Sequence, residues 1–436
     1  MESQVANVDQ ISDLGGLAHA VFTTEVLPAV RWSSPTQELF ADAGSGDYKY
    51  VGSKLVGATD LQRPTGAMGT SGKLPDAAHF DAVNWETTPV RRYRRFAMDN
   101  FTEARATGEG AFEDYAQRVY DQLWGAWRLM EIRQAIGGAA GTLCKVGSRT
   151  SGTVWVAKDG YGHTGMAGTI MLDEGMDIAF IDVSDSNAVG GAGKIQSINH
   201  STGAVTMTAA WDATTNVAAN DLIVAATTTS TSATYFDTER NNAKNGLLSI
   251  VDPGATLTTV LNISESAHAR WKPFRQASST FDTIELTEFM EQLEAKSTFP
   301  VSSETHTVLM SKASRATLAR TLLTFQRQQN LGKVLEGGYQ TVTFGDYDIA
   351  ADAYQLHDVA YAVCDEDLYT VTLEEADFYS EDGSMFQRLS DYDGKEGYVR
   401  EYCNSFSPRR NRHGALTGIT QNAAVDSDDF NPVPNY

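Results

Sequence analysis

The sequence feature that most restricts the possible folds is a long polar segment, residues 46–108. Gly, Ser and Thr are frequent and large aliphatic side chains are scarce between Gly46 and Phe80, and the strand-like sequences YKYVG and VNWETTPVRRYRRFAMDN flank this part. Such a composition cannot bury enough apolar surface to fold alone, and an isolated two-stranded hairpin is marginally stable in water. We therefore predict an extended hairpin that has no stable position in its own subunit and lies on another molecule. The alternative is a flexible surface loop.

The clearest helix is expected within residues 109–140. Apolar side chains recur there at steps of three and four residues, which places them on one face of a helix. The pair Gly137-Gly138 is typical of a helix C-terminus. At 1.5 Å per residue the helix would be roughly 40 Å long, and we expect its apolar face to pack into the core. The residues of this face are Phe112, Tyr115, Val119, Leu123, Trp127 and Met130.

Residues 141–232 differ in composition from the segments on either side, because Thr, Val, Ala, Gly and Asn dominate them. Short apolar runs such as TVWVA, MDIAFIDV and DLIVAA alternate with turn residues, and no helical period is present. This pattern is typical of a small all-β unit, either a barrel or a sandwich. We interpret it as an insertion into the rest of the fold.

The two ends of the chain are expected to lie outside the core. Residues 1–45 predict an N-terminal arm with one short helix, since Pro28 and Pro35 interrupt the helical pattern. The acidic, proline-containing tail, residues 426–436, is expected to be disordered or draped over a surface.

Residues 233–425 combine helices and strands. The sequence TIELTEFMEQLEAK predicts a helix that begins with Asp282 and Glu285 at capping-box spacing. A second helix, SKASRATLARTLLTFQRQQN, is followed by the strand-like sequences TVTFG, YDIAAD, VAYAVCD and LYTVTL. The residues expected on the buried faces of the two helices are Leu286, Phe289, Met290 and Leu293 in the first, and Leu318, Leu322 and Phe325 in the second.

Charge and cysteine content exclude several classes of function. The formal net charge of −22 argues against a protein that coats nucleic acid, because affinity for phosphate depends on Lys and Arg. An acidic wall would suit a container filled with DNA, and a saline host is the other explanation of the acidity. Three widely spaced cysteines argue against a disulfide framework or a cysteine-rich zinc site. Because the chain has no long apolar run and no secretory signal at its start, we expect a soluble protein made in a host cytoplasm.

One motif matches the sequence signature of dinucleotide-binding enzymes. Gly160, Gly162 and Gly165 form a G-x-G-x-x-G pattern after a strand-like sequence. A dinucleotide site needs a helix at the third glycine, and the following MAGTIMLDEGMDIAFIDV favours strand and turn instead. The eight histidines show no HExxH spacing, and neither a GxSxG nor a GxxxxGK[ST] motif occurs. We therefore expect no catalytic, cofactor-binding or metal site and no enzymatic activity.

Two basic clusters stand out from the acidic background. Side chains alternate between the two faces of a strand, so Arg92 and Arg94 are expected on one face, opposite Arg91, Tyr93 and Arg95. This division argues against one continuous basic patch for DNA, and the planar guanidinium suits carboxylates of a neighbouring subunit. We therefore favour intersubunit contacts over nucleic-acid contacts for these arginines. The two clusters are Arg91, Arg92, Arg94 and Arg95, and Arg409, Arg410 and Arg412.

The order of these elements resembles the HK97-type major capsid proteins of tailed double-stranded DNA viruses. The resemblance is carried by the arm (1–45), the extended hairpin (46–108), the helix EGAFEDYAQRVYDQLWGAWRLMEIRQAI (within 109–140), the β insertion (141–232) and the C-terminal sequence MFQRLSDYDGKEGYVREYCNSFSPRRNRHGALTGI. It implies an α+β HK97-type fold with an E-loop, a spine helix, and peripheral and axial domains within residues 233–425. Some members crosslink a hairpin lysine to a neighbour, and Lys54 and Lys73 lie on the corresponding segment without a local pattern that supports this role.

The resemblance implies a shell-building function. Subunits would assemble as hexamers and pentamers into an icosahedral capsid that holds double-stranded DNA without sequence-specific contacts. The expected partners are other copies of the chain, a separate scaffolding protein, a portal and a decoration protein, with the virion as location and no membrane partner. An encapsulin-like protein compartment is the alternative within the same fold. A β-rich hydrolase with a binding module is the alternative from another class.

Overall fold

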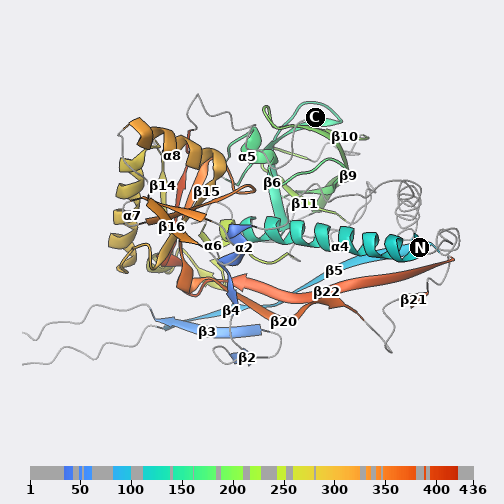
Figure 1. The fold of residues 1–436 in the computed structure, drawn as a ribbon, viewed down its shortest axis with the longest axis horizontal. Helices are drawn as coiled ribbons and strands as arrows, with labels where there is room; N and C mark the ends of the chain where they lie inside the picture. Colours follow the sequence, from blue (N-terminus) through green and yellow to red (C-terminus); the bar gives the residue numbers. More distant parts are fainter. Residues whose placement is uncertain are drawn as a thin grey trace, which may run out of the picture.

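The computed structural model mixes helices and strands around two large sheets and a barrel (Figure 1). The structure describes residues 34–42, 49–51, 54–60, 82–99, 111–137, 141–160, 162–182, 188–209, 217–226, 243–251, 259–278, 281–324, 330–334, 340–344, 347–379, 387–388 and 393–420. The arm before residue 34 and the tail 426–436 lie outside these residues. Within them, no helix is both long enough and apolar enough to cross a membrane.

A mixed seven-stranded sheet holds the main core. Its fully buried strands β15 and β19 pair antiparallel, and each has helices on both of its faces. One face packs against α7 (Thr283–Ser297), and the other packs against the end of α4 (Ala111–Ile136) and against α6 (Leu247–Val251). In spatial order the strands are β14 (Phe274–Ala277), β23 (Gly414–Thr417), β19 (Val359–Cys364), β15 (His306–Ser311), β18 (Tyr347–Asp352), β17 (Gln340–Phe344) and β16 (Asn330–Val334).

The helix α7 follows directly from its sequence. Asp282 caps its N-terminus and accepts a hydrogen bond of 2.8 Å from the backbone N–H of Glu285. Its predicted buried face is confirmed, since Leu286, Phe289, Met290 and Leu293 have no exposed surface. The helix α8 (Lys312–Thr324) is also present where the sequence predicted it, with Leu318 buried.

A second sheet forms a long platform beneath α4 (Figure 1). The strand β5 pairs antiparallel with β22 along its whole length, from Val90 opposite Cys403 to Asp99 opposite Gly394. Trp124 and Trp127 of α4 face this sheet, and the Trp124 ring meets Phe378 edge to face at 5.8 Å. The strands are β1 (Ala41–Asp42), β20 (Tyr369–Phe378), β22 (Gly394–Phe406), β21 (Gln387–Arg388) and β5 (Val90–Asp99).

The described strands between residues 142 and 225 close into a barrel, one of the two all-β forms that the composition predicted. Trp155 and Phe180 fill its interior, with their ring centroids 5.4 Å apart and edge to face. The barrel strands are β6 (Thr142–Arg149), β7 (Val154–Lys158), β8 (Asp177–Asp182), β9 (Ala188–Asn199), β10 (Ala204–Met207) and β11 (Leu222–Ala225).

Short elements complete the described fold. The small sheets consist of β2 (Lys49–Val51), β3 (Lys54–Asp60) and β4 (Ala82–Thr87), and of β12 (Thr259–Val260) and β13 (Ile263–Ser264). The short helices are α2 (Pro35–Glu38), α5 (Met166–Thr169), η4 (Ala269–Trp271), η5 (Asp365–Asp367) and η6 (Arg410–Arg412).

The polar segment 46–108 is partly held by its own subunit, which corrects the sequence prediction. Its first strands form the β2–β3–β4 sheet, whose buried Leu55 and Trp85 pack on Phe406 of the platform. The Trp85 ring lies directly over Gly57, where a Cβ atom would come within 2.2 Å of it. The strand β5 finds its partner in β22, about 300 residues later in the chain. Residues 61–81, the centre of the predicted hairpin, lie outside the described residues.

Two local predictions were wrong. Pro35 begins α2 instead of interrupting a helix, because the first helical position needs no backbone N–H. A single helical turn, α5, follows Gly165 where strand and turn were expected. All four residues of α5 are buried, and this single turn is not the long helix that a dinucleotide fingerprint requires.

The N-cap of α7 generates a stability prediction. The variant Asp282→Ala should lose about 1 kcal/mol of unfolding free energy, because the Glu285 N–H loses its acceptor, whereas Asp282→Asn should stay close to the parent. Urea unfolding of unassembled subunits measures both. Equal losses in the two variants would show that the cap hydrogen bond does not stabilise α7.

Candidate functional site

The Arg92 side chain lies inside the subunit, between the platform and α4. Its Nη1 is 3.3 Å from Oε1 of Glu131 on α4 and also donates to Glu401 on β22. The guanidinium carbon lies 4.6 Å from the centroid of the Trp127 ring. Burial lowers the pKa of Arg92, but Glu401 and the other acidic neighbours outweigh it and raise the pKa above its ordinary value. We call Arg92, Glu131, Glu401 and Trp127 the Arg92 cluster.

Arg410 is fully buried in a similar way. Its Nη1 donates to Oε1 of Glu265 at 2.6 Å, and its Nε donates to the backbone carbonyl of Ile250 at 2.6 Å. The guanidinium also stacks 4.7 Å from the centroid of the Trp271 ring. The predicted intersubunit role is therefore corrected for Arg92 and Arg410, because their partners lie within their own chain and no surface remains for a neighbour.

The other C-terminal arginines share one buried carboxylate, that of Asp367. Arg409 Nε donates to Asp367 Oδ1 at 2.7 Å, and Arg412 Nη1 lies 3.1 Å from Oδ2. Burial raises the pKa of Asp367, and the two arginines oppose this shift. These pairs hold the η6 turn to η5, while Arg409 keeps part of its side chain in solvent.

The remaining predicted contact residues whose side chains the structure describes lie at or near the surface. Arg91 is exposed and Arg94 is partly exposed, which matches the predicted alternation along β5. Lys54 pairs with Glu86 of its own chain at 2.7 Å, a surface ion pair that contributes little to stability. Lys73 and the side chain of Arg95 lie outside the described part of the structure.

The face of the platform turned away from α4 carries a cluster of aromatic and basic side chains that the sequence analysis missed. Tyr93 is 52% exposed, and its hydroxyl shares a hydrogen bond of 2.7 Å with that of Tyr402. The Tyr398 ring stacks on Tyr379 at 4.8 Å, and the Arg400 guanidinium lies 4.4 Å from the Tyr379 centroid. We call this the aromatic face. Its signal in the sequence is the spacing of Tyr398, Arg400 and Tyr402 at every second residue.

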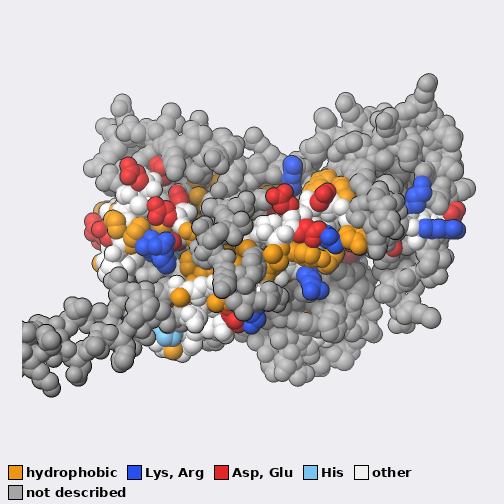
Figure 2. Space-filling view, turned by 90° about the horizontal axis from the view of Figure 1, so that it is seen from below, with side chains coloured by type: hydrophobic (Ala, Val, Ile, Leu, Met, Phe, Trp, Pro, Cys, Tyr) orange, Lys and Arg blue, Asp and Glu red, His pale blue; other side chains and the backbone are white. Residues whose placement is uncertain are grey.

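Figure 2 shows the molecule from this side. Among the described side chains, hydrophobic groups form a band, and basic and acidic groups lie at intervals along it. On the aromatic face, Arg400 Nε donates to Oε1 of Glu374 at 2.8 Å. A surface of this kind offers aromatic contact area together with paired charges.

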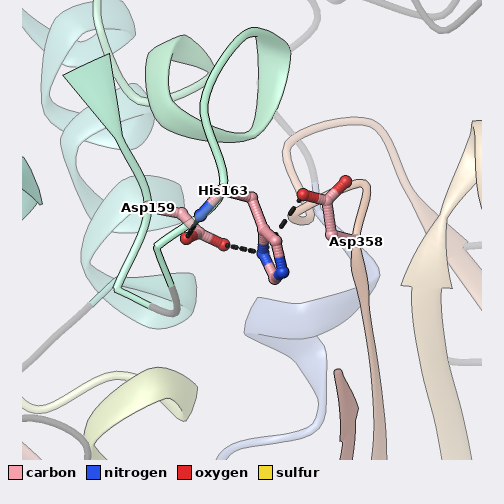
Figure 3. A group of neighbouring side chains, drawn as sticks. All are labelled: Asp159, His163 and Asp358. Atoms are coloured by element: carbon pink, nitrogen blue, oxygen red, sulfur yellow. Dashed lines mark hydrogen bonds and ion pairs between the residues drawn. The ribbon is translucent and has the colours of Figure 1, made fainter. Parts of the chain in front are cut away.

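A second group missed by the sequence analysis is a possible metal site. Asp159, His163 and Asp358 place three ligand atoms within 4.8 Å of one another (Figure 3). Burial raises the pKa of Asp358 to about 6, and the hydrogen bond to Asp159 raises the pKa of His163. The sequence could not indicate this group, because Asp358 belongs to a distant segment of the chain.

Comparison with known proteins identifies solved structures of similar fold. No protein-family model matches the chain, and no curated protein matches its sequence. Among solved structures, a chain of the capsid asymmetric unit of cyanophage A-1(L) is similar at a TM-score of 0.51 and 10% identity, over 92% of this chain and 95% of the other. The resemblance to HK97-type capsid proteins is thereby confirmed as a likeness of fold.

Two further solved structures are similar over nearly their whole length. The capsid of cyanophage P-SCSP1u is 9% identical at a TM-score of 0.44, over 92% of this chain and 93% of the other. The SrpI encapsulin of Synechococcus elongatus is 6% identical at a TM-score of 0.43, over 93% and 94%. At TM-scores below 0.5, neither likeness is used to assign the fold.

The Arg92 cluster generates a prediction with a neighbouring control. The variant Arg92→Met should lose about 3–5 kcal/mol of unfolding free energy, because it leaves Glu401 without its buried cation and Glu131 with only Lys244, at 3.8 Å. The variant Arg91→Met, one residue earlier on the exposed face, should change stability by less than about 0.5 kcal/mol. Urea unfolding of unassembled subunits compares them, and similar stabilities would contradict the structural role of Arg92.

Proposed function

We propose that the chain is the major capsid protein of a tailed double-stranded DNA virus, and that it assembles as hexamers and pentamers into an icosahedral shell. The observation that carries the proposal is the likeness of fold to a cyanophage capsid chain over nearly the whole of both chains. The role needs no catalytic site. Its location would be the virion, after synthesis in the host cytoplasm.

The aromatic face supports a role in subunit contact. Tyrosine and arginine are enriched in protein interfaces, where they contribute much of the binding free energy. Here they lie on the long β5–β22–β20 sheet, whose opposite face is already filled by α4. In the proposal, Arg91 and the tyrosines contact a neighbouring subunit, and Arg94, Arg95, Lys54 and Lys73 are further candidates for such contacts.

The charge of the chain is compatible with DNA as cargo. At a net charge of −22 the shell would repel a packaged genome on average, so DNA would be enclosed without sequence-specific contacts. Further partners in the proposal are a separate scaffolding protein, a portal and a decoration protein. An encapsulin-like compartment would enclose protein instead, and the nucleic-acid content of purified particles distinguishes the two cargoes. A β-rich hydrolase would instead purify as a small oligomer.

The hairpin prediction can be tested without disturbing the described fold. Asp60 and Ala82 are opposite each other at the ends of β3 and β4, so a short turn containing glycine can replace residues 61–81. We expect this variant to give folded, soluble subunits that fail to form closed shells, because each hairpin is proposed to overlap a neighbour. Electron microscopy and sedimentation measure the outcome.

The control for this deletion replaces residues 183–187 with a short turn containing glycine, because Asp182 and Ala188 are opposite each other at the ends of β8 and β9 of the barrel. The control should still assemble. Normal particles from the variant that lacks residues 61–81 would refute the role of the hairpin.

The aromatic face gives a second assembly prediction. The double variant Tyr93→Ser and Tyr398→Ser should raise the subunit concentration needed for assembly at least about tenfold, which corresponds to about 1.4 kcal/mol. Urea unfolding of the unassembled double variant is measured alongside, because Tyr93 is 52% exposed whereas Tyr398 is partly buried and stacks on Tyr379. The control Ile284→Ser removes an apolar side chain that is 63% exposed on α7 and should assemble like the parent. Light scattering across a concentration series measures the subunit concentration at which assembly begins. Equal values for the parent, the double variant and the control would contradict the proposal.

A further inference from the structure

Asp159, His163 and Asp358 meet at a junction between the barrel and the seven-stranded sheet. Asp159 follows the barrel strand β7, and His163 lies in the loop that leads to α5. Asp358 immediately precedes β19 of the sheet. Figure 3 shows the imidazole of His163 between the two carboxylates, which approach it from different segments. The group therefore joins two parts of the fold within a single subunit.

The distances suit ligands of one ion. His163 Nδ1 is 3.1 Å from Asp159 Oδ2 and 3.2 Å from Asp358 Oδ2. Nitrogen and oxygen ligands lie about 2.0–2.2 Å from a zinc ion, so neighbouring ligand atoms around a tetrahedral ion are about 3.3–3.6 Å apart. Small side-chain movements would lengthen the distances from His163 Nδ1 to the two carboxylate oxygens to that value.

The loop that carries two of these residues is held in shape by its own hydrogen bonds. Asp159 Oδ1 accepts from the backbone N–H groups of Gly162, at 2.6 Å, and His163, at 2.8 Å. Gly162 has a φ of +103°, a conformation that favours glycine. Because Oδ1 is occupied in this way, Asp159 presents Oδ2 to the imidazole. The ligand atoms are thus positioned before any ion arrives.

Charge and exposure at the junction also favour a cation. The Asp159 side chain is 1% exposed and that of Asp358 is 20% exposed, so both carboxylates are largely removed from water. Arg275 is close enough to lower the pKa of His163, so the two carboxylates have one arginine and one imidazolium as their cations, and a divalent ion bound by the neutral imidazole would replace the imidazolium charge. The His163 side chain keeps 34% exposure, which leaves a route from solvent to the site.

We propose that Asp159, His163 and Asp358 bind a divalent transition-metal ion of the zinc class, which fastens the barrel to the seven-stranded sheet. Imidazole nitrogen together with carboxylate oxygen favours zinc and its neighbours over calcium or magnesium, which prefer oxygen ligands alone. The three ligands come from one chain, so the site exists in the unassembled subunit. It goes beyond the proposed shell function and does not depend on it.

The test is Zn²⁺ binding by the full-length, untagged chain after treatment with a chelator. Competition with a chromophoric chelator should show one Zn²⁺ per chain. The variants Asp358→Asn and His163→Gln should each weaken that binding at least about tenfold, because the loss of a direct ligand should cost no less than the loss of an outer-shell partner. The control His268→Gln, at the start of η4, should bind like the parent. The three cysteines are buried and should not compete for the ion.

Two results would overturn the proposal. One is a parent chain that binds no stoichiometric Zn²⁺. This result needs no variant, and it would mean that the three side chains form only a hydrogen-bonded triad. The other is equal Zn²⁺ affinity in the parent, Asp358→Asn and His163→Gln. Asp358→Asn keeps the shape of the side chain and an oxygen that can accept from His163, and circular dichroism without metal checks that it folds.

Discussion

The buried ion pairs of Arg92 fix the relation between α4 and the platform. One guanidinium contacts a carboxylate on the helix and another on β22, and it stacks on Trp127. A charge removed from water is stable only with well-placed partners. The cluster therefore favours the one alignment of α4 on the platform strands in which Arg92 meets both carboxylates. The β5–β22 pair is held by its own ladder from Val90 opposite Cys403 to Asp99 opposite Gly394, and the cluster sets where α4 lies on it.

The alternation of side chains along β5 and β22 gives the platform two chemically different faces. Arg92 and Glu401 face α4 and stabilise the subunit, whereas Tyr93, Arg400 and Tyr402 face away and are available to a neighbour. A sheet with one face buried and the other rich in tyrosine and arginine is suited to repeated contacts between copies. In the proposed shell, many such contacts would sum to a rigid container although each is weak.

The sequence predicted the local elements well and the long-range pairings poorly. The helix α7, its cap at Asp282 and its buried face follow from a 3.6-residue period, which is a local property. The partner of β5 does not, because Arg92 and Glu401 are 309 residues apart and a strand pattern does not specify which strand it joins. The same limit made buried arginines look like intersubunit contacts and hid the group formed by Asp159, His163 and Asp358.

Electron cryomicroscopy of the purified full-length chain tests the central claim most directly. The account predicts closed icosahedral particles in which a neighbouring subunit covers Tyr93 and Tyr398, while Arg92 stays buried under α4 of its own subunit. Monomers or small oligomers at high concentration, or particles in which the aromatic face remains in solvent, would contradict it.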